Sequence, residues 1–214
     1  MTDLADLPIL TATEARILGC LIEKKLLTPD VYPLTLNAAQ AAANQKTARE
    51  PVMALEQAEI HHALKTLEQK ELVRQVFGSR VERYEHLAAQ RFSLTTPQTA
   101  LLGLLLLRGP QTAYELLSRS ERMARFQSAE ALKDELDMLI GKRPALVKEI
   151  GRGPGQREDR YAHLLCGDVE ASSFVPAAAS AVPASNAVAE LEARIATLEE
   201  QVASLTARLD QLTA

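Results

Sequence analysis

One eight-residue pattern that carries arginine, tyrosine and histidine occurs twice in the chain. It reads RVERYEHL at residues 80–87 and REDRYAHL at residues 157–164, so the shared pattern is R-x-x-R-Y-x-H-L. A tyrosine and a histidine with an arginine nearby have the side chains of an acid–base site. The pattern is therefore either an active-site signature used twice or part of one structural unit that has been duplicated.

The remaining reactive or ligand-binding side chains do not form a recognisable catalytic or metal site. His61 and His62 are adjacent, so on a helix they point about 100° apart and cannot share one metal ion. His163 and Cys166 are two candidate ligands without a second pair nearby. The stretch GRGPGQ at 151–156 lacks the G-K-[ST] ending and the following helix of a phosphate-binding loop. We therefore expect no metal, no cofactor and no enzymatic activity.

The segment before each copy of the pattern has the periodicity of a helix followed by a hairpin. In the first copy, the helix is expected to end near Lys70 and the hairpin to turn at Gly78–Ser79. In the second copy, Ser128 is the expected N-cap, Gly141 and Pro144 stop the helix, and GRGPGQ is the hairpin tip. The apolar faces of the two helices consist of Ile60, Ala63, Leu64 and Leu67 in the first and of Ala131, Leu132, Leu136 and Leu139 in the second.

Each copy also begins with a long helix and a short one. The first long helix is expected within 11–27 with Thr13 as N-cap. The second is expected within 95–109 with Thr96 as N-cap and Pro97 at its first position. Short helices follow near 36–45 and 111–120. The repeated unit is thus helix, short helix, helix and hairpin.

This order of elements is that of the winged helix-turn-helix. We predict a mostly α fold with small β-hairpins (α+β), in which an N-terminal tail at 1–10 precedes two tandem winged-helix domains at 11–90 and 91–170. The pattern R-x-x-R-Y-x-H-L is then the returning strand of each wing. Tyr84 and Tyr161 are expected to pack on the domain body, and the arginines to face solvent or the partner domain. Duplication of the whole unit favours two domains over two active sites.

The chain resembles the bacterial YceH-like family, a group of largely uncharacterised proteins, over roughly residues 11–170. The resemblance is carried by ARILGCLIEK (15–24), YPLTLNAAQAAANQKTAREPVM (32–53), RVERYEH (80–86), LLLRGPQTAYELLSRSERM (105–123) and GQREDRYAHLL (155–165). It implies two tandem winged-helix domains, in agreement with the repeat. It implies little about activity, because the family has no established biochemical function.

The C-terminal segment has a different composition. Residues 171–186 are rich in alanine, serine and proline and are expected to be a linker. Within 187–214 the apolar residues recur at alternating spacings of three and four, which predicts a parallel two-stranded coiled coil and hence a homodimer. The alternative is an amphipathic helix that folds back on its own domain, but such a helix usually has a wider apolar stripe. The predicted dimerisation residues are Val188, Leu191, Ile195, Leu198, Val202, Leu205, Leu209 and Leu212.

The charge of the chain gives no overall attraction to nucleic acid. The net charge is −4, and residues 171–214 hold two of the 24 basic and five of the 28 acidic residues, so the rest is close to neutral. Contact with double-stranded DNA would need local basic patches. The candidate DNA-binding residues, on the third helices, the loops beside them and the wings, are Lys46, Arg49, His62, Lys65, Arg80, Lys142, Arg143, Arg152 and Arg157.

The third helix of the second repeat favours another partner. It carries Glu130, Asp134, Glu135 and Asp137 against Lys133, and carboxylates facing a phosphate backbone would be repelled. Two hypotheses follow. The chain is a DNA-binding or transcription-associated homodimer, or it is an adaptor that binds a protein partner through its second domain without touching nucleic acid.

Features of the chain that bear on its cellular compartment are few. No window holds 18 unbroken apolar residues, and the N-terminus MTDLADLPIL lacks the pattern of a signal peptide. Cys20 and Cys166 cannot make a disulfide framework and are expected to be buried thiols. We therefore expect a cytoplasmic protein without membrane contact.

Overall fold

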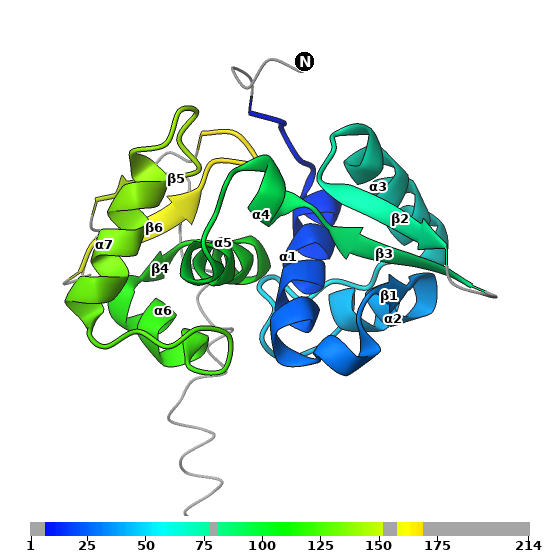
Figure 1. Ribbon diagram of the computed structural model, residues 1–214, viewed down its shortest axis with the longest axis horizontal. Coiled ribbons are helices and arrows are strands. Elements are labelled where there is room, and N and C mark those ends of the chain that lie inside the picture. The colour runs from blue at the N-terminus through cyan, green and yellow to red at the C-terminus, as the bar shows by residue number, and fades with distance from the viewer. Residues whose placement is uncertain (1–6, 78–80, 152–157, 169–214) are drawn as a thin grey trace, which may run out of the picture. The chain divides into compact units, whose positions relative to one another are not determined.

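The computed structural model describes residues 7–77, 81–151 and 158–168, all of which lie in one compact unit formed by residues 1–173. This part of the chain is a mixture of helices and small antiparallel sheets (Figure 1). The first repeat contains α1 (Ala12–Leu27), the 3-10 helix η1 (Pro29–Val31), β1 (Leu34–Thr35), α2 (Leu36–Ala43), α3 (Gln57–Gln69), β2 (Val73–Phe77) and β3 (Glu82–His86). After α4 (Ala88–Arg91), the second repeat contains α5 (Thr96–Arg108), β4 (Gln111–Thr112), α6 (Ala113–Ser120), α7 (Ala129–Ile140), β5 (Val147–Ile150) and β6 (Arg160–His163).

The predicted order of helix, short helix, helix and hairpin is present in both repeats. The sequence did not predict the two-residue strands β1 and β4, because two residues are too few to show an alternation. Each of them pairs with the strand that carries the repeated pattern, so the sheet orders are β1-β3-β2 and β4-β6-β5. The registers match: Leu34 lies opposite Tyr84, and Gln111 lies opposite Tyr161.

The N-caps of the long helices differ from those predicted. Thr11 caps α1 in a capping box with Glu14, and Thr95 caps α5 in a capping box with Gln98. The predictions of Thr13 and Thr96 were wrong. A capping box needs Glu or Gln three residues after the threonine, and neither Thr13 nor Thr96 has one at that position. The prediction of Ser128 as the N-cap of α7 is confirmed by its hydroxyl, which accepts a hydrogen bond from the Ala131 amide.

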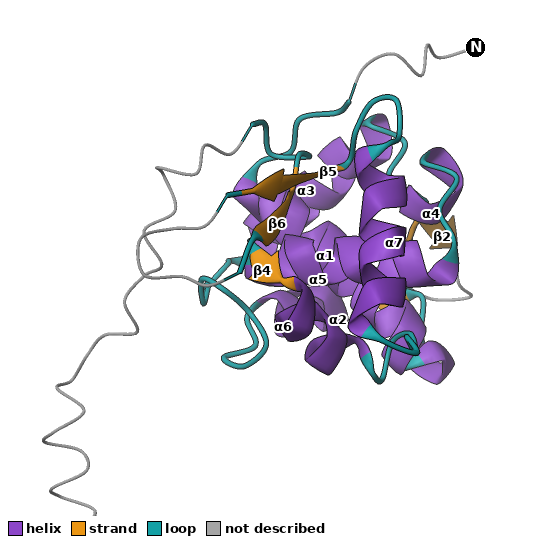
Figure 2. Cartoon of the chain, turned by 90° about the vertical axis from the view of Figure 1, so that its left-hand side faces the viewer, coloured by secondary structure: helices purple, strands orange, loops and turns teal. Residues whose placement is uncertain are grey.

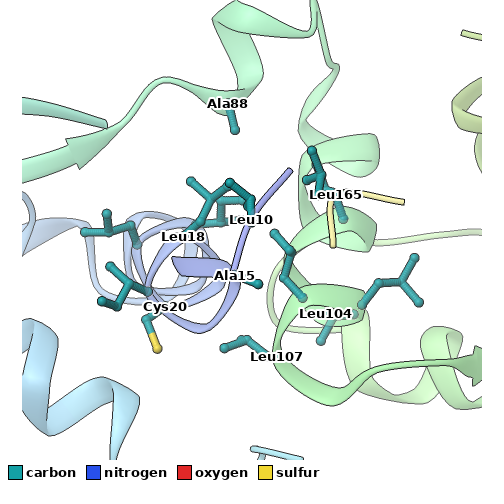
Figure 3. Packing of buried hydrophobic residues seen from close by; sticks show 14 of the residues in the cluster. Leu10, Ala15, Leu18, Cys20, Ala88, Leu104, Leu107 and Leu165 are labelled. Atoms are coloured by element: carbon teal, nitrogen blue, oxygen red, sulfur yellow. The ribbon is translucent and has the colours of Figure 1, made fainter. Parts of the chain in front are cut away.

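The two long helices α1 and α5 pack against each other at the centre of the described unit (Figure 2). Leu18 of α1 and Leu104 and Leu107 of α5 are labelled among the buried side chains of this region in Figure 3. Most buried apolar residues of both repeats belong to a single cluster. The two repeats therefore share one core rather than having a core each.

The repeated pattern has a structural role in both copies. Tyr84 and Tyr161 are buried, with 1% and 6% of their surface exposed, as predicted. The prediction that the arginines face solvent or the partner domain was wrong for Arg83 and Arg160, whereas Arg80 and Arg157 lie outside the described residues. The Nη1 atoms of Arg83 and Arg160 donate hydrogen bonds to the carbonyls of Pro33 (2.7 Å) and Pro110 (3.0 Å). Each arginine thereby fastens its strand to the segment before the short helix of its own repeat.

Three further expectations concern single residues and segments. Cys20 is buried as expected, but Cys166 is exposed, because it follows the end of β6 instead of lying within the strand. Among the described helices none combines the length and the apolar character that crossing a membrane requires. The hairpin tips, the linker at 171–186 and the predicted coiled coil at 187–214, with all eight of its dimerisation residues, lie outside the described residues.

Candidate nucleic-acid interface

Helix α3 of the first repeat has one buried and one exposed face. Its four apolar residues Ile60, Ala63, Leu64 and Leu67 are buried against the core, as the periodicity predicted. On the opposite side Glu59, His61 and His62 are exposed. The Glu59 carboxylate accepts a hydrogen bond of 2.8 Å from the Glu56 amide, so the acidic group on this face is partly engaged by the helix end. His62 is therefore available to a ligand at the surface.

Lys65 on the same helix is largely committed to the protein itself. Its Nζ donates to Gln75 Oε1 of β2 at 2.6 Å and to Glu68 Oε2 at 3.2 Å. The side chain remains 40% exposed. Its first role is thus to connect α3 with the hairpin, and contact with a phosphate would have to compete with these two acceptors.

The segment 44–56 between α2 and α3 contains the two candidates Lys46 and Arg49, and the structure separates them. Lys46 is exposed. Arg49 is 5% exposed, and its Nη1 and Nη2 atoms donate to the Glu23 carboxylate at 3.0 and 2.6 Å. Its Nε donates to the Ala42 carbonyl at 3.0 Å. Arg49 is therefore an internal residue that cannot reach DNA, and we remove it from the candidate contacts.

The buried pair of Arg49 and Glu23 is electrostatically satisfied. Burial opposes ionisation of Glu23, but the hydrogen bonds and the charge of Arg49 outweigh it, so the pKa of Glu23 lies below its ordinary value. The pKa of Arg49 lies above its ordinary value, since burial is outweighed by the hydrogen bonds with Glu23. Both groups therefore stay charged at neutral pH.

Several further contacts hold segment 44–56 in place. Arg16, which is 2% exposed, donates from Nη1 to the Ala43 carbonyl at 3.2 Å and from Nη2 to the Pro51 carbonyl at 2.5 Å. The amide of Glu50 donates to the Leu107 carbonyl at the end of α5, at 2.9 Å. Lys46 is consequently presented by a segment that is fixed to both repeats.

The candidates Arg80, Arg152 and Arg157, which were predicted to lie on wings, fall outside the described residues. On the described strands of the first hairpin, Arg74 of β2 forms an ion pair with Glu85 of β3. In the second hairpin, Lys148 of β5 forms an ion pair with Asp168. Arg74 and Lys148 are thus paired with acids, and Arg83 of β3 is held by the Pro33 carbonyl.

Helix α7 presents an acidic surface. Glu130, Asp134 and Asp137 are exposed beside Lys133. A hydrogen bond from its own backbone and one from Ser128 lower the pKa of Glu130 below its ordinary value, so this carboxylate is ionised at the helix N-terminus. A phosphate backbone would meet several like charges on this helix.

Two large apolar side chains are exposed in the second repeat. Met138 on α7 is 63% exposed, and Tyr114 on the neighbouring helix α6 is 58% exposed. Apolar side chains beside carboxylates are more typical of a protein-binding surface than of a DNA-binding one.

Lys142 and Arg143 are brought together with residues that the sequence did not single out. They follow the end of α7 and line a pocket with Arg91 and Phe92, which come from the segment that joins the repeats. The sequence contains no signal for this grouping, since Arg91 lies outside the repeated pattern and has no periodic relation to Lys142.

The histidine of each copy of the repeated pattern has a buried ring nitrogen without a hydrogen-bond partner in the described part of the chain. His86 is 3% exposed, and neither of its ring nitrogens has a hydrogen-bond partner in the described part of the chain. Burial, together with the charge of Lys25, lowers the pKa of His86 to about 3. Burial lowers that of His163 to about 4. Among the described residues no three His, Cys, Asp or Glu side chains gather in a way that could hold a metal ion.

Comparison with known proteins relates residues 10–156 to the family model described as "Protein of unknown function, DUF480". A UPF0502 protein of Mesorhizobium japonicum is 79% identical over 168 residues, which cover 78% of this chain and 80% of the relative. A UPF0502 protein of Xanthomonas campestris is 54% identical over 179 residues (84% and 80%). One of Stenotrophomonas maltophilia is 54% identical over 168 residues (78% and 76%). The expected likeness to a bacterial family without assigned function is thus confirmed, although none of these relatives carries the YceH name.

Proposed function

Because the chain belongs to the DUF480 family, described as proteins of unknown function, its activity is inferred from its own residues, and we propose that it binds double-stranded DNA through the third helix of its first repeat. In this proposal each repeat is a winged-helix domain, 11–90 and 91–170, with α3 or α7 as the third helix and β2–β3 or β5–β6 as the wing. The protein acts without catalysis, in the cytoplasm, as a transcription-associated dimer joined by the coiled coil at 187–214.

The observation that carries the proposal is the exposed face of α3. The apolar side of α3 is buried, and His62 is exposed on the opposite side. Glu59 on that side accepts a hydrogen bond from the Glu56 amide at the start of the helix. Lys46 is exposed in the anchored segment that leads into this helix. A rigid helix with a polar free face and a nearby cation suits insertion into a major groove with a phosphate contact beside it. The wing residue Arg80 is expected to add a second phosphate contact.

The second repeat supports a different partner. The exposed acids of α7, with Met138 and Tyr114 exposed nearby, favour the docking of a basic protein surface. We therefore retain as the second candidate function an adaptor role, in which the second repeat binds a protein partner and the chain does not contact nucleic acid.

The DNA proposal is tested by fluorescence anisotropy of the full-length protein with random and genomic duplexes at several salt concentrations. Binding is expected to weaken steeply with salt, because phosphate contacts release counterions. Lys46→Glu is expected to weaken binding by about tenfold or more and to lower the salt slope by about one. Arg152→Ala with Arg157→Ala tests the second wing in the same assay.

The matched control is Lys133→Glu, which makes the same charge change on an exposed residue of α7. This variant is expected to bind DNA as the unsubstituted protein does. Absence of binding at low salt would refute DNA recognition, and the adaptor role would then be tested by reversing Asp134 and Asp137 to lysine. Equal losses in Lys46→Glu and Lys133→Glu would show that only the net charge matters.

A further inference from the structure

A pocket of about 230 Å³ lies where the segment joining the repeats meets the loop after α7. Its walls come from Arg91, Phe92 and Ser93 on one side and from residues 142–144 and Leu146 on the other. Lys142 Nζ donates to the Ser93 carbonyl at 3.1 Å and so ties the two sides together. The pocket is separate from the face of α3 proposed to meet DNA.

Arg91 supplies a cation whose recorded ion pair within the described part of the chain is long. Its side chain is only 16% exposed, and its Nε is buried without a hydrogen-bond partner in the described part of the chain. The nearest carboxylate recorded for it is that of Glu71, whose Oε2 is 3.8 Å from Nε, too far for a hydrogen bond. An anionic ligand in the pocket could approach the Arg91 guanidinium to hydrogen-bond distance, which the Glu71 carboxylate does not reach at Nε.

Lys142 and Arg143 add two more cations with donors to spare. One ammonium proton of Lys142 is used by Ser93, and an ammonium group has three. Arg143 is exposed, and its Nη1 donates to the carbonyls of Gly141 (3.2 Å) and Lys142 (2.9 Å). Its Nε and Nη2 atoms make no hydrogen bond to a described residue. They can therefore donate hydrogen bonds to an anion at the mouth of the pocket.

The rest of the lining is apolar. Leu146 belongs to the buried core, and Phe92 packs against that core. Together with Pro144 they form the apolar wall of the pocket. Three cations beside an apolar wall would attract an anion and also accept a compact apolar group. The volume lies below the roughly 300 Å³ at which drug-sized ligand pockets begin, which argues for a small acid rather than a nucleotide.

We propose that this pocket binds a small organic acid, in which a carboxylate or phosphate headgroup meets Arg91, Lys142 and Arg143 and a compact apolar group lies against Phe92, Pro144 and Leu146. Because the ligand would bridge the joining segment and the loop after α7, its binding would stiffen the connection between the repeats. The site is independent of DNA binding and stands if the proposed function fails.

The test is an NMR titration of the ¹⁵N-labelled full-length protein at constant ionic strength. The probes are benzoate, phenyl phosphate, acetate, inorganic phosphate and the uncharged benzamide. Benzoate and phenyl phosphate are expected to give saturable shifts of the amides of 91–93 and 142–146 and to bind more tightly than acetate and phosphate. Benzamide is expected to leave these amides unchanged.

Arg143→Gln is the informative variant, because Arg143 is exposed and the substitution does not disturb the core. It is expected to weaken benzoate binding by about tenfold, the loss of one charge-assisted hydrogen bond. Arg125→Gln, which changes another exposed arginine outside this pocket, is expected to bind as the unsubstituted protein does. The proposal is overturned if none of the four anions gives saturable shifts, if benzamide acts like benzoate, or if Arg143→Gln binds unchanged.

Discussion

Gly103 of α5 lies so close to Ile22 of α1 that a Cβ built on the glycine would be 2.6 Å from the Ile22 Cγ2 atom. The contact is reciprocal, since a Cβ on Gly19 of α1 would be 2.9 Å from the Leu107 Cγ atom of α5. Each glycine is eight positions after the capping threonine of its helix, Thr11 or Thr95. The repeats are therefore joined by equivalent positions of their first helices.

Gly103→Ala is expected to destabilise the protein by about 1–3 kcal/mol, because the new methyl group overpacks the helix contact. At an open helical position the same change would stabilise by up to about 1 kcal/mol. Denaturant unfolding measures the difference, with Gly151→Ala, which has open space around it, as the control. In a double-mutant cycle Ile22→Ala should relieve part of the loss; strict additivity of the two changes would contradict the packing argument.

Glu23→Gln is expected to cost about 3–5 kcal/mol, because it leaves the buried Arg49 guanidinium without its counter-ion. Glu68→Gln breaks an exposed pair with Lys65 and should cost at most about 1 kcal/mol. Chemical denaturation of both variants makes the comparison. Similar losses in the two variants would show that burial of the Arg49 pair has no energetic consequence.

The stability of the protein is expected to fall between pH 7 and pH 5 because of His86. Its folded pKa of about 3 is below the unfolded value of about 6.5, so in this range the unfolded chain binds a proton that the folded chain does not. The stability is thus fully present above the unfolded pKa and is lost as the pH falls, by about 2 kcal/mol at pH 5. His86→Leu should remove about half of the fall in unfolding free energy between pH 7 and pH 5, because His163, with a folded pKa of about 4, contributes a similar amount. An unchanged slope would refute this assignment.

The dimer proposal makes a separate prediction about the C-terminal heptads. Leu198→Asp with Leu205→Asp places charges at two core positions of the predicted coil, which should abolish dimerisation. Light scattering after size-exclusion chromatography would then give the mass of a monomer, 23.4 kDa. Exchange of Glu199 and Glu200, which lie outside heptad positions a and d, for glutamine is a matched control on the same segment. A dimer that survives the two aspartates would exclude the coil as its interface.

Local signals in the sequence were sufficient for most helices and for the repeat. The spacing of Ile60, Ala63, Leu64 and Leu67 predicted the buried face of α3, and the serine at 128 predicted the start of α7. These features depend on neighbours three or four positions away, so they can be read along the chain. The strands β1 and β4 could not be predicted, because their partners are about 50 residues away and each is only two residues long.

The candidate site depended far more on contacts between distant residues. Arg49 and Lys46 look alike in the sequence, yet one is buried against Glu23 and the other is exposed, because packing of α1 against segment 44–56 encloses only one of them. Arg91 and Lys142 form one pocket only because the joining segment lies against the loop after α7. The sequence alone established the duplicated unit, its helices and its total charge. The packing of the two repeats into one core decided which charged side chains are exposed and which are buried, since burial is a property of the whole fold.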